Sequence, residues 1–212
     1  MRVVPVDKFV KYITPMAEGC PEFVARREVI ATVADLCRAT GCITAETSFT
    51  TIPGIAEYDI PMAEGLHVEM VRHAYCDHME MRSVRFDELT NAVRRTDWFN
   101  QGGEPCFYTF KRTDWIRLMP RPDDEHLIHL DVIVAVDRET KVVPEQFFTE
   151  WLDAVVAGAL NRIFRIAGQV YSNQQLAERQ LLLYQQGVAD IHADAVRDFT
   201  RTTGRVKFNR IM

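Results

Sequence analysis

The chain has 212 residues, a net charge of −5 and 47% hydrophobic residues. This size allows one ordinary core, or one core with a small inserted domain, and the acidic balance argues against general nucleic-acid binding. No apolar run is long enough to span a bilayer, and residues 1–5 lack the apolar centre of a signal peptide. A protein made in the cytoplasm, with no membrane partner, is therefore expected.

The cysteines are odd in number and scattered along the chain, and none forms a CxxC pair. This usage predicts reduced thiols with a structural role rather than a disulfide framework. The five residues are Cys20, Cys37, Cys42, Cys76 and Cys106.

The first helix is predicted to begin after Gly19 and Cys20. Pro21 suits the first helical position, where its missing N–H has no partner to lose, and Gly41 suits the C-terminal stop. Between them, one face of the helix is marked at helical spacing by Phe23, Arg27, Ile30, Val33, Ala34 and Cys37.

From residue 43 to residue 142 the hydrophobic period changes toward two, which is typical of strands. Residues 48–52 and 55–60 flank Pro53-Gly54; this pair is typical of a type II turn, so a hairpin is expected. Residues 85–98 are ambiguous and contain a pattern that fits a short helix. Tight turns between short strands predict an antiparallel sandwich or barrel-like domain, with further strands at 68–76, 81–84, 106–111, 115–119 and 127–136.

The second main helix is predicted from Pro144 to Gly168. Gly158 lies within it, where Ala would be more favourable by about 1 kcal/mol, so close helix packing is expected there. The last helix is predicted over residues 172–200, capped by Ser172 with Gln175 as its capping-box partner. Its apolar stripe consists of Ala177, Leu181, Tyr184, Val188, Ile191, Ala195 and Phe199.

The last helix would be about 40 Å long at about 1.5 Å per residue, which is more than one small domain needs for its own core. Contacts between subunits are therefore expected along its stripe, at Leu181, Tyr184, Val188 and Ile191.

These elements predict an α+β fold in which a helical bundle body carries an inserted antiparallel β domain, because no helix can bury its stripe alone. The body is built from one N-terminal and two C-terminal helices, and the last of them is long. The expected parts are an N-terminal segment with the first helix (1–42), the β domain (43–142), the helix pair (143–200) and a basic tail (201–212).

No catalytic site, metal site or cofactor is predicted. His67, His73, Cys76 and His78 are close in sequence, but His73 and Cys76 would face opposite sides of a strand. Cys76 and His78 would share a face, and two ligands do not close a metal site. The acidic loop 123–125 has no fixed partner for acid–base catalysis. The sequence contains neither GxSxG nor GxxxxGK[ST].

The tail combines cations with interleaved apolar residues and contains no acid. It fits either a solvated terminus or an arm that orders on an acidic partner, and the alternating apolar residues favour the arm, which also suits strand addition. The residues of this predicted docking segment are Arg201, Arg205, Val206, Lys207, Phe208, Arg210 and Ile211.

Several segments, in this order, resemble the head-to-tail adaptor (connector) proteins of short-tailed and related bacteriophages. GCPEFVARREVIATVADLCRAT is similar to the opening helix of that family, and TTIPGIAEYDIP to its hairpin with a G-x-x-E-Y segment. GGEPCFYTF, followed by WIRLMPRPDD, resembles its G-x-P-x-x-Y strand and L-x-P-x-P loop. The helix pair that follows in the family is matched by VPEQFFTEWLDAVVAGALNRIFRIAGQVYSNQQLA.

The resemblance implies a structural protein of the virion neck that has no catalytic activity. In that family a dodecameric ring lies beneath the portal, continues the DNA channel and presents a docking surface to tail components such as nozzle or tail-fibre proteins. Carried over, residues 201–212 would contact the portal, the β domain would lie toward the periphery and the tail, and genomic DNA would pass through the lumen without specific binding.

Three other readings of the sequence compete with this one. The protein could be a ring protein at another level of the neck or tail, a soluble enzyme with an unrecognised site, or a nucleic-acid-binding module. The missing catalytic motifs argue against the enzyme, and the acidic balance argues against the nucleic-acid module.

Overall fold

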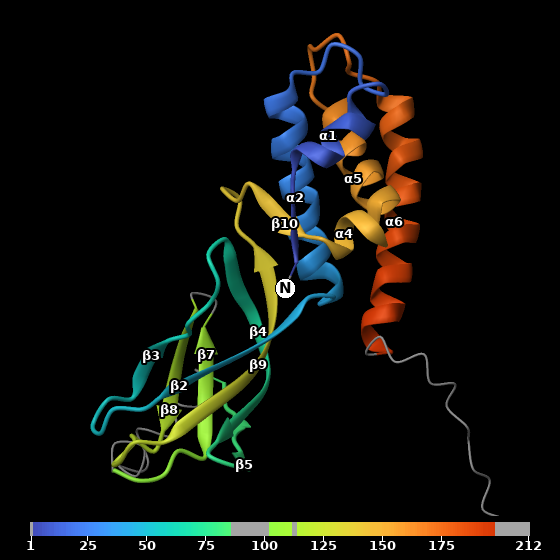
Figure 1. Ribbon diagram of the computed structural model, residues 1–212. Helices are drawn as coiled ribbons and strands as arrows, with labels where there is room; N and C mark the ends of the chain where they lie inside the picture. The colour runs from blue at the N-terminus through green and yellow to red at the C-terminus, as the bar shows by residue number, and fades with distance from the viewer. Residues whose placement is uncertain (1, 86–101, 112–113, 198–212) are drawn as a thin grey trace, which may run out of the picture.

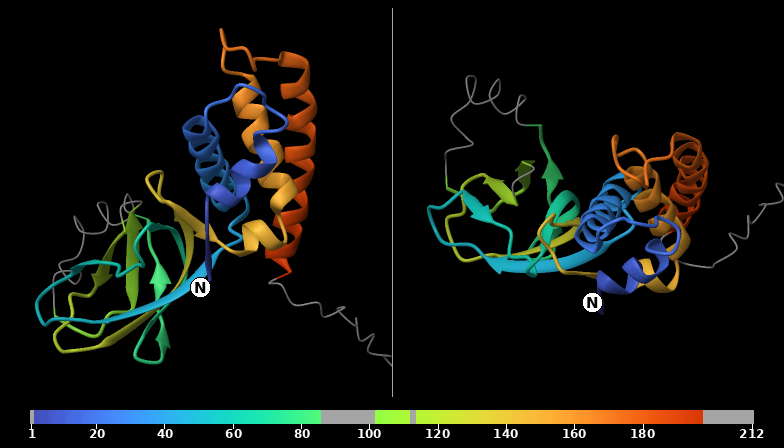
Figure 2. Two further views of the ribbon diagram at one scale, coloured as in Figure 1. Left: turned by 45° about the horizontal axis from the view of Figure 1, so that its top comes forward. Right: turned by 90° about the horizontal axis from the view of Figure 1, so that it is seen from above.

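The structure is a computed structural model that describes residues 2–85, 102–111 and 114–197. The molecule is elongated, with helices gathered at one end and most of the strands at the other (Figure 1). Seen from above, the helical part and the strand part lie side by side (Figure 2). The mixture of helices and largely antiparallel sheets confirms the predicted α+β class.

Three helices make up most of the helical part: α2 (Glu22–Thr40), α5 (Leu152–Phe164) and α6 (Gln174–Val196). Each of them contacts the other two. The shorter helices α1 (Asp7–Ile13) and α4 (Gln146–Thr149) pack at their side, α1 against α2 and α5, and α4 against α5.

The first predicted helix is confirmed as α2, with one change at its start. Gly41 has a φ of 62° and donates its N–H to the carbonyl of Cys37, so it ends the helix as predicted. Pro21 is extended, at φ −63° and ψ 140°, and is therefore the N-cap rather than the first helical residue.

The predicted continuous helix from Pro144 to Gly168 is wrong. Strand β1 (Val3–Pro5) pairs antiparallel with β10 (Val142–Pro144), and this pairing holds the chain extended up to Pro144. A short α4 follows, and a break at Trp151, which lies at φ −121° and ψ 22°, separates it from α5. The pairing partner lies some 140 residues away in sequence, which a local pattern cannot reveal.

The strand part consists of two four-stranded sheets. The first has the order β2-β9-β4-β5 and the second the order β3-β8-β7-β6. All their pairs are antiparallel except β6–β7, which is parallel, so the predicted purely antiparallel domain is corrected at that edge. The bounds are β2 Thr44–Thr50, β3 Glu57–Asp59, β4 Leu66–Cys76, β5 Met79–Glu80, β6 Arg82–Ser83, β7 Phe107–Lys111, β8 Trp115–Met119 and β9 Leu127–Val136.

The turn at Pro53-Gly54 is confirmed, but the hairpin is wrong. Ile55 donates its N–H to the carbonyl of Ile52, and Gly54 has the positive φ of 84° that a type II turn needs. The flanking strands nevertheless belong to different sheets, because β2 pairs with β9 and β3 with β8. The Tyr58 hydroxyl fixes the connection from β2 in one sheet to β3 in the other by hydrogen bonds to the backbone of Ile52 and Ile55.

The predicted strand 81–84 is divided in a similar way. A turn follows Cys76, and Asp77 occupies it with a φ of 52°. Met81 is buried between β5, which pairs with β4, and β6, which pairs with β7 of the other sheet. The four remaining predicted strands, 68–76, 106–111, 115–119 and 127–136, correspond to β4, β7, β8 and β9.

One continuous buried cluster links the two parts of the molecule. Along β9, buried and half-buried residues alternate as far as Ile133, and the last three residues, Val134 to Val136, are all buried. This change occurs where β9 reaches α2. The end of β9 is therefore covered on both faces, which suits its continuous run of apolar residues from Val132 to Val136.

Candidate assembly surfaces

Helix α6 begins one residue later than predicted. The Asn173 side chain caps it by accepting a hydrogen bond from the Leu176 N–H at 3.0 Å. Ser172, the predicted cap, instead lies near the carbonyl of Phe164, with its hydroxyl 3.4 Å from that oxygen. The 23 described residues of α6 make a rod of about 34 Å.

The predicted stripe of α6 faces the helices of its own chain. Ala177 and Ile191 are fully buried, and Tyr184 and Val188 pack against the core. Leu181 is half-buried on the same side. The stripe thus builds the helical core, and subunit contacts at these residues stay a prediction.

Glycines allow α6 to approach its neighbours closely. A Cβ atom on Gly158 would lie 2.4 Å from Thr32 Cγ2 of α2 and 2.7 Å from Tyr184 Cδ2 of α6. A Cβ atom on Gly187 would lie 2.5 Å from the Cβ of Ala154 in α5. The close packing that the sequence predicted at Gly158 is confirmed, and Gly187 is a second such site that the apolar stripe alone does not indicate.

A groove of about 500 Å³ runs between α2 and one flank of α6. Tyr184, Val188 and Ala39 give it an apolar floor, and Asp35 and Arg38 line its α2 side. Asp35 forms an ion pair with Arg162 of α5. Burial raises the pKa of Tyr184 to about 12, so its phenol is neutral at physiological pH.

The opposite flank of α6, next to α5, carries two exposed leucines. Leu176 and Leu183 are seven residues apart, and Leu183 is one turn from Gly187, which contacts α5. Their exposed fractions are 40% and 49%. Leu182 is 68% exposed and points away from both helices, because it lies about 160° around the helix from Tyr184 and about 180° from Ile191.

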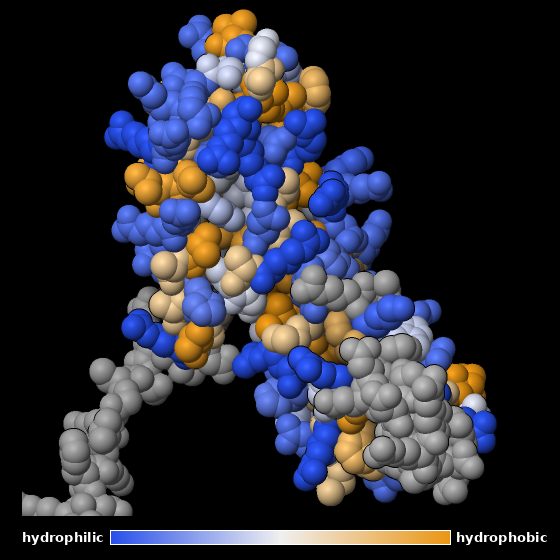
Figure 3. Space-filling view, turned by 180° about the vertical axis from the view of Figure 1, so that it is seen from behind, coloured by the Kyte–Doolittle hydropathy of each residue, from blue (hydrophilic) through white to orange (hydrophobic). Residues whose placement is uncertain are grey.

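On the face that Figure 3 shows, apolar groups interrupt a largely hydrophilic surface in both parts. In the strand part, Ile52 and Ile55 are exposed on either side of the turn at Pro53-Gly54. This turn lies at the end of the β2–β3 connection, away from the helices (Figure 1). The Gly54 N–H donates to the Pro122 carbonyl, which ties the turn to the loop before β9.

The titratable side chains noted in the sequence form several separate contacts. His73 lies 3.1 Å from Glu80, and His67 lies between Asp137 and Glu69 at 2.8 and 3.0 Å. In the acidic loop, the Asp124 carboxylate accepts the N–H of Glu125.

A further cluster was missed by sequence reasoning. Cys76, Asp77 and His126 place one donor atom each within 4.8 Å of one another. His126 is fifty residues from Cys76, so no spacing pattern could signal this contact.

The predicted docking tail, 201–212, lies outside the described residues, as does most of the ambiguous segment 85–98. Within the described part of the chain, no helix is long and apolar enough to cross a membrane.

Comparison with known families identifies one match. The family described as SU10 adaptor protein matches residues 21–207, which is well over half of the chain. The match includes α2, both sheets, α5 and α6. A search of curated proteins gave no match.

Proposed function

Because the chain belongs to the SU10 adaptor protein family, a family of phage head–tail adaptors, we propose that it forms a ring between the portal and the tail. The single observation that carries this proposal is the match over residues 21–207. The ring, a dodecamer by resemblance to the adaptors of short-tailed phages, would continue the DNA channel in the virion neck. The protein's role there is structural and not catalytic.

We propose a helical body with an inserted β domain as the working arrangement of this adaptor. The helices α2, α5 and α6 would form the body of the ring. The β domain, residues 43–142, would extend from it toward tail components such as nozzle or tail-fibre proteins. The exposed Ile52 and Ile55 at its far turn support this orientation, because exposed apolar side chains at a loop tip are suited to partner contact.

A closed ring needs two unlike surfaces on each subunit that fit each other. The two flanks of α6 differ in this way: one carries Leu176 and Leu183, and the other borders the groove against α2. In the proposed ring, the leucines of one subunit enter the groove of the next. Tyr184 and Val188, two of the predicted subunit-contact residues, line that groove and would receive them.

The basic tail, 201–212, is proposed as the portal-contacting segment, and DNA would cross the lumen without specific binding. The net charge of −5 supports weak DNA contact, since a specific binder needs a basic surface.

Ring formation is tested by sedimentation of the protein with and without portal. Leu183→Asp is expected to abolish assembly, because a charge would enter an apolar contact. Leu182→Asp is the matched control on the neighbouring leucine and is expected to assemble normally. Equal assembly of both variants would overturn the proposed contact, and imaging that places the ring away from the portal would favour another neck or tail ring protein.

A further inference from the structure

The imidazole of His126 lies between two carboxylates that belong to different connections of the strand part. Its Nδ1 is 3.0 Å from Asp77 Oδ2, and its Nε2 is 3.7 Å from Asp123 Oδ1. Asp77 occupies the turn after β4, and Asp123 belongs to the loop before β9. Because the carboxylates face opposite ring nitrogens, they are not placed to share one metal ion. Both can accept a hydrogen bond from a doubly protonated imidazole.

Asp77 is held firmly against the Nδ1 side of the ring. Its backbone N–H donates to the carbonyl of Leu127 at 2.8 Å, and its Oδ1 accepts the N–H of Leu127 at 2.9 Å. The hydrogen bond from His126, followed by that from Leu127, lowers the pKa of Asp77, and the charge of His78 adds to this effect. Since a carboxylate can only accept, Nδ1 carries a proton, and the ring gains or loses its second proton at Nε2.

The Nε2 atom of His126 is buried and has no hydrogen-bond partner among the described residues. In the neutral ring it is an acceptor that faces another acceptor, the carboxylate of Asp123, and this arrangement is unfavourable. A proton at Nε2 turns it into a donor toward that carboxylate. The Asp123 side chain is 59% exposed, so it has room to move from 3.7 Å to hydrogen-bond distance.

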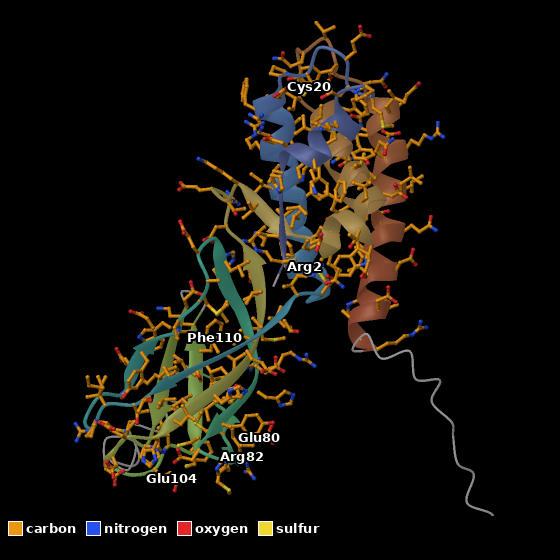
Figure 4. The ribbon with its side chains drawn as sticks, in the orientation of Figure 1. Arg2, Cys20, Glu80, Arg82, Glu104 and Phe110 are labelled. Atoms are coloured by element: carbon orange, nitrogen blue, oxygen red, sulfur yellow. The ribbon has the colours of Figure 1, made fainter. Side chains whose placement is uncertain are left out.

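The other groups around the ring favour its charged form or carry no charge. Glu104, which lies at the end of the molecule away from the helices (Figure 4), adds negative charge. The Cys76 thiol is neutral, because burial, followed by the charges of Asp77 and Glu104, raises its pKa to about 12. Strand β2 contributes only the uncharged hydroxyl of Thr51. The hydrogen bond to Asp77 outweighs the burial of the ring, so the pKa of His126 is raised.

We propose that His126 forms a pH-dependent link between the turn after β4 and the loop before β9. When the ring is doubly protonated, it donates to Asp77 and to Asp123 and so joins the two segments. When the ring loses its second proton, the contact with Asp123 is lost and the contact with Asp77 remains. The segments are about fifty residues apart in sequence, so the complete link closes a long loop.

The loop that this link would hold also supports the exposed turn between β2 and β3. The Thr51 hydroxyl donates to the carbonyl of Asp124 and accepts the N–H of His126, and the Gly54 N–H donates to the carbonyl of Pro122. Protonation of His126 is therefore expected to steady this turn. Only its use in binding a tail component rests on the proposed function; the link itself concerns the isolated chain and does not depend on the ring.

The direction of the pH dependence follows from the raised pKa of His126. A group whose pKa is higher in the folded state contributes stability that is fully present below its unfolded value, about 6.5 for histidine. This contribution is lost as the pH rises through the folded value. The link should therefore stabilise the strand part in mildly acidic solution and weaken above neutral pH.

The test is an NMR titration of the histidine Cε1–H signals in the full-length protein, with His126→Gln used to assign the signal of His126. The wild-type midpoint is expected above about 6.5. Asp123→Asn should move it to lower pH. Asp124→Asn is the matched control from the same loop and should leave it unchanged, because the Asp124 carboxylate accepts the N–H of Glu125. In denaturant unfolding, the stability advantage of wild type over His126→Gln should shrink as the pH rises.

A wild-type midpoint at or below about 6.5 would overturn the proposal, and this readout does not depend on any variant folding. Equal midpoints in Asp123→Asn and Asp124→Asn would overturn it too, as would a stability difference from His126→Gln that is constant with pH. In each case the contact between Asp77 and His126 would be structural alone.

Discussion

The helical part and the strand part obtain their structure from different kinds of information. In the helical part, the residues that define α2 and α6 are neighbours in sequence, and their apolar spacing marks the elements directly. In the strand part, every strand of the first sheet except β5 depends on a distant partner, as β2 (Thr44–Thr50) does on β9 (Leu127–Val136). The position of each strand therefore follows from the local sequence, whereas its pairing depends on residues far along the chain.

The two parts are also held together differently. Close contact at small residues, Gly158 and Gly187, sets the distance between helices. Side-chain hydrogen bonds to the backbone fix the loops of the strand part, as at Thr51, whose hydroxyl bonds to the backbone of Asp124 and His126. The helical part should therefore be sensitive to added volume, and the strand part to lost polar contacts.

The largest effect is expected from adding volume between the helices. Gly158→Val should lower the free energy of unfolding by about 3 kcal/mol, because its side chain would overlap Thr32 and Tyr184, and overpacking of this kind is costly. Denaturant unfolding followed by circular dichroism measures the loss. Ala189→Val, at an exposed position of α6, is the control and should change stability by less than about 1 kcal/mol. Similar losses in the two variants would show that β-branching, and not volume, matters at Gly158.

A smaller loss is expected from removing one hydroxyl in the strand part. Thr51→Val should cost about 1–3 kcal/mol, because the partly buried N–H of His126 loses its acceptor while the shape of the buried Thr51 side chain is kept. Thr47→Val is the matched control, since the Thr47 hydroxyl donates to the Pro61 carbonyl at an exposed position. Equal stability of the two threonine variants would show that the hydrogen bonds of Thr51 contribute no more to stability than the exposed hydrogen bond of Thr47.

The same division explains which features the sequence predicted. Gly41, the strands at β7 to β9, the turn at Gly54 and the close packing at Gly158 depend on local backbone or periodic signals, and all are present. The break at Trp151 was not predicted, because it follows a strand paired with the N-terminal segment.

Long-range contacts account for the sequence features that were missed. The crossing of β2 and β3 into different sheets depends on strand partners that lie far along the chain. The meeting of Cys76 with His126 depends in turn on the pairing of β4 with β9, which aligns Cys76 with Ile128. A period-two pattern identifies a strand and its buried face but does not identify the strand with which it pairs.

The ion pair that joins the helical part to the strand part should contribute less to the free energy of unfolding than the packing within either part. Arg38 of α2 lies 2.7 Å from Glu69 of β4, in a partly exposed ion pair that links the helical part to the strand part. Glu69→Gln is expected to cost about 1 kcal/mol at neutral pH. Glu22→Gln, in the exposed pair with Arg26, is the control and should cost less.

The contribution of this joint should depend on pH in a defined direction. Burial raises the pKa of Glu69, but the hydrogen bonds from Arg38 and His67 outweigh it, so the net pKa is lowered. A lowered pKa in the folded state adds stability above the unfolded value of about 4.3, and this is lost as the pH falls through the folded value. The difference between wild type and Glu69→Gln should therefore shrink below about pH 4. A difference that is constant with pH would indicate that the ionised carboxylate is not what stabilises the joint.

The smallest effect on folding, and a large one on assembly, is expected from deleting residues 201–212. Among the residues that the structure describes, Ala195 is the last one of the α6 stripe that packs on the core, so the free energy of unfolding should change by less than about 0.5 kcal/mol. Portal docking should be lost, since Phe208 offers about 1.5–3 kcal/mol on burial, whereas exposed pairs of Arg201 or Arg205 offer about 0.2–1 kcal/mol each. Phe208→Ala should weaken docking at every salt concentration, and Arg201→Gln with Arg205→Gln mainly at low salt, where the charges are least screened. Normal assembly of the truncated chain on the portal would show that the tail is not needed for docking and that the helical and strand parts suffice.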